Sequence, residues 1–254
     1  MFKKGKPNSK PDTLSGHMKR RQKYRARRTA LFALVLLLSA AFGSSCSWLK
    51  PSKNKNGRES ELHALPIAPD VDYARALDLG NGRKLYYSEH DMIYAAGDQF
   101  YPIVVRAFPR LVGLSPDGDK VAFLEPFEFE MATDLYVFDV PARTLRQLTS
   151  HRDENSTRSV RTAHWFDNRT LYYLEGYRYG TVSRGGDLWR VDIQSVTRQP
   201  IVRIMGTGEG FKEIVEFEFV PDRKMIRYVV VKHDDVGSET REAYYCALDG
   251  TPIP

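Results

Sequence analysis

The stretch LSPDGDKVAFL at residues 114–124 is followed by DLYVFDV at residues 134–140 and by LRQLT at residues 145–149. A Pro-Asp-Gly turn signal leads directly into an apolar run rich in β-forming residues, which predicts a strand entered from a tight turn. The second run predicts another strand, and the third closes the unit. Together they predict one antiparallel unit of short strands joined by turns.

This unit is repeated along the chain. A clear copy is HWFDNRTLYYL at residues 164–174, with DLWRVDI at residues 187–193. Weaker copies begin at residues 219 and 79. Repeats of about 40–50 residues made of short strands are typical of β-propeller blades. The apolar strand positions that align between the copies are Leu85, Val121, Leu171 and Ile226.

The pattern SPDG-x-x-apolar-A-F, then DLYV-x-D, then QLT resembles the WD-repeat-like blade of TolB-type periplasmic β-propellers. The same blade occurs in the non-catalytic propeller of prolyl oligopeptidase relatives. The resemblance implies an all-β fold of about four recognisable four-stranded blades over residues 70–254. Propellers of this family have six or more blades, so a closed four-bladed ring, an open partial propeller and a truncated product all stay open.

Several residues of the repeat have structural roles in this interpretation. Asp139 and Asp192 are expected to accept hydrogen bonds from strand or turn amides. Cys246 falls in an expected strand and is interpreted as a small buried residue. One repeat position carries a large ring that can fill the space between sheets, and it holds Tyr136, Trp189 and Tyr244.

The charge of the chain is concentrated at its N-terminus. The net charge is +6, yet residues 1–45 hold 11 Lys/Arg and one acid, so residues 46–254 carry a net charge of −4. The basic residues therefore belong to the N-terminal segment and give no argument for nucleic-acid binding.

Residues 1–45 have the pattern of an export signal: a cationic stretch, an uncharged apolar run from Ala30 to Phe42, then small residues. Met18 is a second candidate start. The segment Phe42-Gly-Ser-Ser-Cys46 resembles a bacterial lipoprotein lipobox, which implies lipidation of Cys46 and cleavage before it. An uncleaved membrane anchor and an ordinary cleaved signal are the alternatives. All three predict an extracytoplasmic protein, and residues 46–69 are interpreted as a flexible tether.

Motifs of several enzyme classes do not occur in the sequence. It has no Gly-x-Ser-x-Gly, P-loop, His-Glu-x-x-His or dinucleotide-binding fingerprint, and no His pair with metal-ligand spacing. We therefore expect no enzymatic activity, no cofactor and no metal. The acidic run at residues 125–130 is either a charged edge or a loop that displays carboxylates.

Loops between strands are where propellers usually dock ligands and partners. The loop from His151 to Arg158 and the arm from Tyr177 to Gly180 carry Tyr and Arg, which are favoured in binding hot spots. The expected partner-binding residues are Tyr177, Arg178, Tyr179, His151 and Arg152. The sequence thus predicts an exported, lipid-anchored, non-enzymatic propeller that binds an envelope protein or a wall component. The alternative is a propeller enzyme, or a metal-dependent hydrolase or lyase, that uses residues of the central channel.

Overall fold

A computed structural model describes residues 59–65, 75–152, 156–179, 183–206, 211–234 and 238–253. The described part consists of β-strands and one short 3-10 helix, Pro221–Arg223. The expected signal segment and Cys46 lie outside the described residues. No helix in the part that the structure describes has the length and apolar character to cross a membrane.

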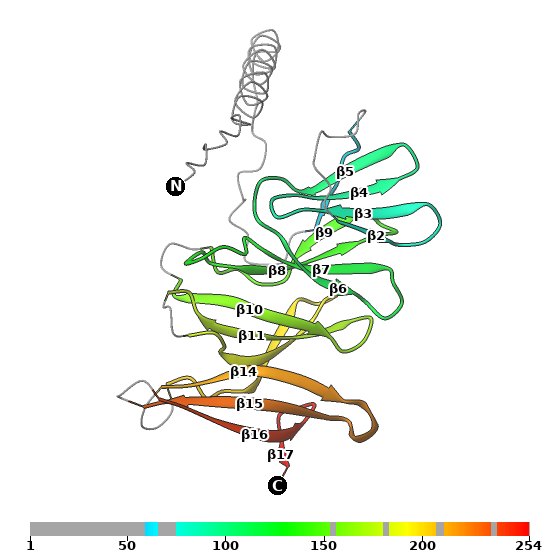
Figure 1. The fold of residues 1–254 in the computed structure, drawn as a ribbon. Helices are drawn as coiled ribbons and strands as arrows, with labels where there is room; N and C mark the ends of the chain where they lie inside the picture. Colours follow the sequence, from blue (N-terminus) through cyan, green and yellow to red (C-terminus); the bar gives the residue numbers. More distant parts are fainter. Residues whose placement is uncertain are drawn as a thin grey trace, which may run out of the picture. The chain divides into compact units, whose positions relative to one another are not determined.

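The strands form four antiparallel sheets that follow one another in chain order (Figure 1). The first sheet contains β2 (Arg75–Asp78), β3 (Arg83–Tyr87), β4 (Met92–Ala96) and β5 (Gln99–Val104). The second contains β6 (Arg110–Leu114), β7 (Lys120–Glu125), β8 (Asp134–Asp139) and β9 (Thr144–Gln147), with β1 (Glu59–Glu61) added at its outer edge. The third contains β10 (Arg158–Trp165), β11 (Thr170–Tyr177), β12 (Asp187–Asp192) and β13 (Thr197–Val202). The fourth contains β14 (Phe211–Val220), β15 (Met225–His233), β16 (Glu239–Ala247) and β17 (Pro252–Ile253).

Apart from the added β1, each sheet is a four-stranded up-and-down unit of the kind found in propeller blades, so the expected all-β fold and the four repeats are confirmed. The sequence alignment of the repeats is also correct, because its four equivalent apolar positions are all fully buried: Leu85, Val121, Leu171 and Ile226. They lie on the second of the four strands of their sheets, which has a hydrogen-bonded strand on each side.

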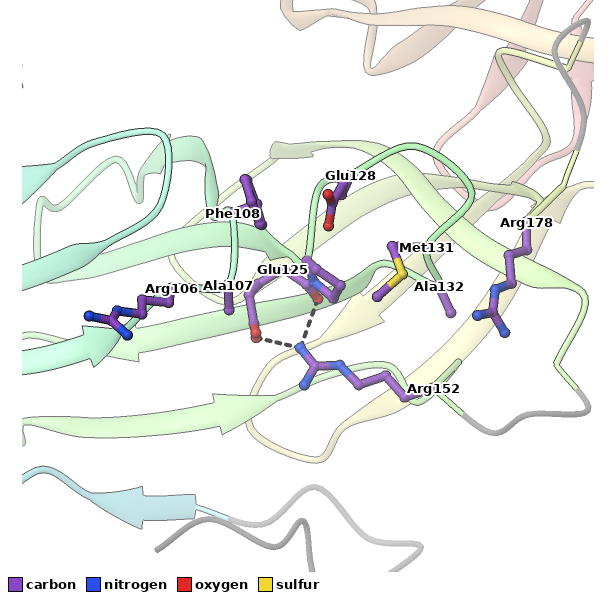
Figure 2. A pocket seen from close by; sticks show the side chains of 10 residues that line it. Arg106, Ala107, Phe108, Glu125, Glu128, Met131, Ala132, Arg152 and Arg178 are labelled. Atoms are coloured by element: carbon purple, nitrogen blue, oxygen red, sulfur yellow. Dashed lines mark hydrogen bonds and ion pairs between the residues drawn. The ribbon is translucent and has the colours of Figure 1, made fainter. Parts of the chain in front are cut away.

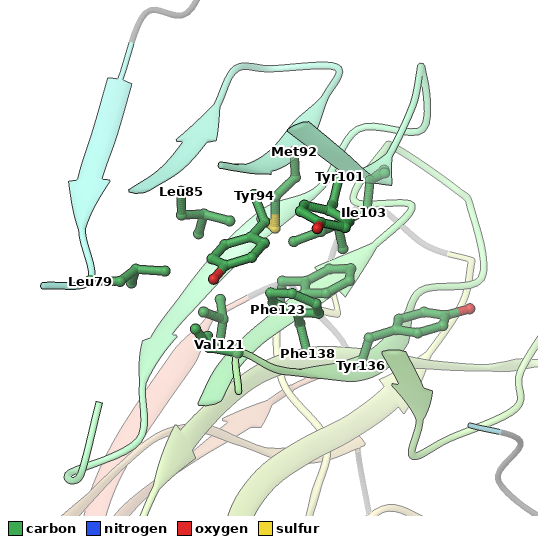
Figure 3. Packing of buried hydrophobic residues seen from close by; sticks show 12 residues of the cluster. Leu79, Leu85, Met92, Tyr94, Tyr101, Ile103, Val121, Phe123, Tyr136 and Phe138 are labelled. Carbon is green, nitrogen blue, oxygen red and sulfur yellow. The ribbon is translucent and has the colours of Figure 1, made fainter. Parts of the chain in front are cut away.

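Buried apolar side chains pack between consecutive sheets. Tyr94 and Tyr101 of the first sheet lie against Phe138 of the second, with the ring centroids of Tyr94 and Phe138 5.2 Å apart (Figure 3). A second cluster joins the second and third sheets, and a third joins the third and fourth. Within the described residues, none of these three clusters joins the first sheet to the last.

The turn carboxylates act as the sequence predicts. Asp139 Oδ1 accepts a hydrogen bond from the amide of Ala142 at 2.9 Å, and Asp192 Oδ1 accepts from the amides of Gln194 and Ser195. Cys246 is buried, as expected. The shared ring position is less uniform, because Tyr136 is buried whereas Tyr244 is 38% exposed on β16. Seven consecutive residues of β16, from Glu239 to Tyr245, are exposed.

The first described residues form an extra strand on the second sheet. β1 pairs with β9, and the Leu65 amide then donates to the carbonyl of Phe100 in β5 at 2.7 Å. Glu59 accepts from Arg146, whose guanidinium also donates to the carbonyl of Ile193 at 2.8 Å. These residues fall in the stretch interpreted as a tether. The sequence of this stretch shows no alternation of apolar residues, because all three residues of β1 are exposed and the strand pairs through its backbone alone.

A second link joins the third sheet to the fourth. The segment Ser183–Gly186 runs beside β14, where Gly186 and Ile214 exchange two backbone hydrogen bonds of 2.9 Å. The buried carboxylate of Glu213 accepts from the Ser183 hydroxyl at 2.8 Å and from the Gly185 amide at 2.9 Å. A Cβ at Gly185 would overlap the carbonyl oxygen of Ile214, so only glycine fits this close approach.

Candidate functional site

A pocket of about 420 Å³ lies where connections from the first three sheets meet. Antiparallel strands place alternate connections at the same end of a sheet, and the pocket uses four of these connections. They are the β5–β6 loop, the β7–β8 loop, the segment after β9 and the segment after β11. The lining residues, drawn in Figure 2, are Arg106, Ala107, Phe108, Glu125, Pro126, Glu128, Met131, Ala132, Arg152 and Arg178.

Unusual backbone conformations hold two of these connections. Arg106, Phe108 and Glu130 have φ values of 55°, 49° and 58°, a left-handed region that costs energy for residues other than glycine. The other non-glycine residues with positive φ in the described part lie at tight turns between strands. The Arg106 amide donates to Asp91 Oδ1 at 2.8 Å, and the Phe127 amide donates to the Phe108 carbonyl at 2.7 Å. Such strain is commonly found at functional sites.

Arg152 is held at the floor of the pocket. Its Nη2 atom lies 2.5 Å from Glu125 Oε2 and donates to the Glu125 carbonyl at 3.1 Å, and its Nε atom lies 3.7 Å from Asp134 Oδ2 (Figure 2). Burial raises the pKa of Glu125, although the Arg152 charge opposes that shift. Burial likewise raises the pKa of Asp134 against its hydrogen bonds with Thr149 and His151.

Arg106 and Arg178 are differently placed. Neither guanidinium has a carboxylate partner among the described residues. Arg178 donates through Nε to the Glu130 carbonyl at 3.3 Å and lies 4.9 Å from the ring centroid of Tyr179, which leaves both Nη groups available. Figure 2 shows Arg106 and Arg178 at opposite ends of the pocket, with Arg152 between them.

Exposed apolar side chains occur on the same connections. Phe129 is 70% exposed, the largest value among the large apolar residues of the described part. The other exposed large apolar residues on these connections are Val105, Phe127, Met131 and Tyr179. Five of the nine such residues in the described part therefore gather at this one end. Aromatic residues and Met beside Arg are the composition of a protein interface.

A buried polar network lies between the second and third sheets, next to the pocket. His151 Nε2 lies 3.1 Å from Glu175 Oε2, and Arg198 pairs with the same carboxylate. Burial alone would raise the pKa of Glu175, but the close contact with His151 and the Arg198 charge outweigh it and lower that pKa. Arg198 also donates to the Tyr173 hydroxyl at 2.6 Å. The Glu175 carboxylate is thus paired with both His151 and Arg198 inside the protein, which assigns this network a structural role.

The structure separates the five residues that the sequence singled out. Arg152 and Arg178 line the pocket, and Tyr179 is 52% exposed beside it. Tyr177 is half-buried, with its ring 6.0 Å from that of Phe211. His151 is buried against Glu175, so it offers no exposed surface to a partner.

Sequence reasoning did not find Arg106, Ala107 or Met131. Their contribution depends on loops that are distant in the chain meeting at one place. The acidic run at residues 125–130, which the sequence marks as a possible loop displaying carboxylates, supplies Glu125, Pro126 and Glu128 to the lining. No group of His, Cys, Asp and Glu side chains within the described ranges has an arrangement that could hold a metal ion.

A family model described as "Domain of unknown function (DUF4652)" matches residues 135–245. No curated protein matches the chain. Among solved structures, a "putative conserved lipoprotein" from Clostridium novyi NT is 16% identical with a TM-score of 0.46, covering 56% of this chain and 95% of that one. A prolyl endopeptidase is 15% identical with a TM-score of 0.45, covering 78% of this chain and 26% of that one. Tricorn protease is 13% identical with a TM-score of 0.42, covering 78% and 17%. This chain thus spans only a minor part of the two proteases.

Proposed function

We propose that this protein is an exported, lipid-anchored, non-enzymatic β-propeller-type module. It binds another protein of the cell envelope or a wall component through the pocket and the exposed side chains around it. The single observation that carries the binding role is the gathering of Phe129, Met131 and Tyr179 at one end of the sheets, beside two arginines that have no carboxylate partner among the described residues. Concave, mostly apolar pockets with a few polar groups are the usual form of binding sites.

The polar groups of the pocket favour binding over catalysis. Catalytic acids and bases need access to a reacting group, and enzymes commonly tune the pKa of such groups by burial. Glu125 has a raised pKa and lines the pocket, which is the feature that a propeller enzyme would use. However, the ion pair with Arg152 holds the Glu125 carboxylate in place. The Asp134 carboxylate accepts hydrogen bonds from the Thr149 hydroxyl, the His151 amide and the Gln147 side chain. These contacts are those of a fixed scaffold.

The export part of the proposal rests on the sequence. The cationic stretch, the apolar run and Cys46 after small residues are the pattern of a lipoprotein signal. Radiolabelled palmitate should label the wild-type chain in cells and should not label Cys46→Ser. A chain that carries no label, or that carries it equally in both forms, would remove the lipid anchor from the proposal.

The binding part is tested by crosslinking in cells. A photo-crosslinking amino acid placed at Phe129 in the full chain should capture a partner from the envelope. The matched position is Tyr245, which is 39% exposed on the fourth sheet and lies away from the pocket connections. Capture at position 129 that is absent at position 245 and is lost in Met131→Asp supports the proposed site. Equal capture at both positions, or none at position 129, rejects it.

A further inference from the structure

We propose that the pocket binds an acidic peptide segment of its partner. An apolar side chain of that segment enters between Ala107, Met131 and Ala132, and carboxylates on either side of it contact Arg106 and Arg178. This inference rests on the proposed binding function and specifies the chemistry of the partner. It depends on the shape of the pocket, on the two arginines that make no ion pair within the described part of the chain, and on the order of the lining residues.

The size and lining of the pocket suit a side chain. A volume of about 420 Å³ falls at the lower end of the roughly 300–1,000 Å³ found for ligand sites. Ala107, Phe108, Pro126, Met131 and Ala132 provide an apolar lining, in which the two alanines leave room for a side chain. Met131 is also flexible and 41% exposed, so it can adapt to the group that enters.

Counted over the residues that line it in the described structure, the pocket has an excess of positive charge. Three arginines and two glutamates line the pocket. Arg152 and Glu125 neutralise one another, so the charges that are left are those of Arg106 and Arg178 and the single negative charge of Glu128. A guanidinium presents several N–H donors in a fixed plane and pairs well with a carboxylate. Because the rest of the chain after residue 45 is mildly acidic, this local excess of positive charge distinguishes the pocket from its surroundings.

The positions of the two arginines add a geometric requirement. Figure 2 shows Arg106 at one end of the pocket and Arg178 at the other. A ligand that reaches both must extend across the opening, as an extended peptide does, with its central side chain over Met131 and Ala132. The stacking of Arg178 on Tyr179 fixes that guanidinium before a ligand arrives, which lowers the entropy cost of binding.

A membrane surface fits the site less well. Phe129 is exposed enough to insert into lipid, but Glu128 and Glu130 flank it directly in the chain. Insertion of Phe129 would carry both carboxylates into the lipid interface, where their desolvation costs energy. A flat lipid surface also cannot enter a concave pocket. The observations therefore favour a protein segment, and lipid binding becomes an alternative outcome of the test.

The test selects peptides without assuming their sequence. A phage library of random nonapeptides is selected on the purified full chain and, in parallel, on the double variant Arg106→Glu, Arg178→Glu. Both residues lie in loops and make no ion pair in the described part, so the variant should fold. The charge-matched control is the double variant Arg223→Glu, Lys224→Glu, whose two residues are exposed in the turn between β14 and β15 at the opposite end of the strands.

Wild type and the Arg223→Glu, Lys224→Glu control should enrich peptides with Asp or Glu on both sides of a large apolar residue. The best of these should bind the double variant at least about tenfold more weakly, roughly 1.4 kcal/mol. Enrichment without acidic residues, or equal binding by the double variant, overturns the inference. Binding only to vesicles of phosphatidylglycerol and phosphatidylethanolamine, lost in Phe129→Asp, would assign the surface to lipid instead.

The same variants separate this inference from the function on which it rests. If crosslinking at position 129 captures a partner in wild type and equally in the double variant, the binding function stands and the acidic segment is wrong. If position 129 captures nothing, the binding function itself fails.

Discussion

The carboxylate of Glu213 accepts a hydrogen bond from the backbone amide of Gly185, with Oε2 and N 2.9 Å apart, and so ties the third sheet to the fourth. Glu213 is 1% exposed, and its carboxylate also accepts from the Arg184 amide and the Ser183 hydroxyl. An acceptor-only group thus serves three donors at one sheet junction.

Glu213→Gln should destabilise the fold. The new NH2 group is a donor facing donors, so at least one buried N–H loses its partner, which costs about 2–3 kcal/mol. Urea unfolding followed by fluorescence measures the change. The control is Glu216→Gln on the same strand, where the side chain is exposed and the expected change is within about 0.5 kcal/mol. Equal effects of the two variants would contradict the role of Glu213.

Gly185→Ala should destabilise through the backbone. The added Cβ overlaps the carbonyl oxygen of Ile214, so the segment must move away from β14 at a cost of about 1–3 kcal/mol. Because the movement also breaks the Glu213 contact, the losses in the double variant with Glu213→Gln should be less than additive. Additive losses would show that the two contacts are independent. Thermal unfolding of the four forms completes the cycle.

Glu175→Gln should flatten the acid side of the stability profile. The pKa of Glu175 is lowered in the folded protein, so its contribution is present above the ordinary value of 4.5 and is lost as the pH falls through the folded-state pKa. A difference of one bound proton between the folded and unfolded states changes the free energy of unfolding by about 1.4 kcal/mol per pH unit, which is the largest slope that Glu175 can contribute. Unfolding free energies of both forms from pH 7 to pH 3 measure this difference.

Glu125 and Asp134 act in the opposite direction. Their pKa values are raised, so their contribution is present below the ordinary values and is lost as the pH rises through the folded-state values. Both residues are retained in Glu175→Gln, so the loss that appears only in wild type as the pH falls below 4.5 reports Glu175. A variant profile that is parallel to wild type below pH 4.5 would contradict the assignment.

Arg146→Ala should weaken the junction of the second and third sheets. The change removes two hydrogen bonds to the carbonyls of Ile193 and Gln194, at 2.8 and 3.1 Å, and the ion pair with Glu59. We expect a loss of about 1–2 kcal/mol in chemical denaturation. Glu59→Gln removes only the half-exposed ion pair and should cost less than about 1 kcal/mol. A larger loss for Glu59→Gln would reverse this order.

The repeats could be predicted from the sequence because local turn chemistry and strand pattern coincide in each copy. Asp117-Gly118 and Asp167-Asn168 mark the turns, and the strands that follow carry the buried positions Val121 and Leu171. Asp134 and Asp187 also belong to the recurring pattern, but the sequence alone does not predict which groups their carboxylates bind. Each begins the third strand of its sheet and accepts amide hydrogen bonds from residues after the fourth strand, His151 and Met205 respectively.

The pocket could be predicted only in part. Arg152 and Arg178 stood out because they occur in loops, whereas Arg106 is a single basic residue after a strand and becomes notable only when the chain brings it near the other two. His151 carries the same polar signal as Arg152 but turns inward to Glu175. Residue type alone does not predict which of two adjacent loop residues faces the interior and which faces the pocket.

The strand β1 determines where mechanical load enters the protein. A pull transmitted from the N-terminal side reaches Glu59–Glu61 first, and only after these residues does it reach Leu65 and then β2. The load therefore falls on the β1–β9 hydrogen bonds and the Glu59–Arg146 pair, at the outer edge of the second sheet. Those short contacts would give way before the inner strands of the first sheet carry tension. A protein held by its N-terminus could thus lengthen by several residues while its four sheets stay folded.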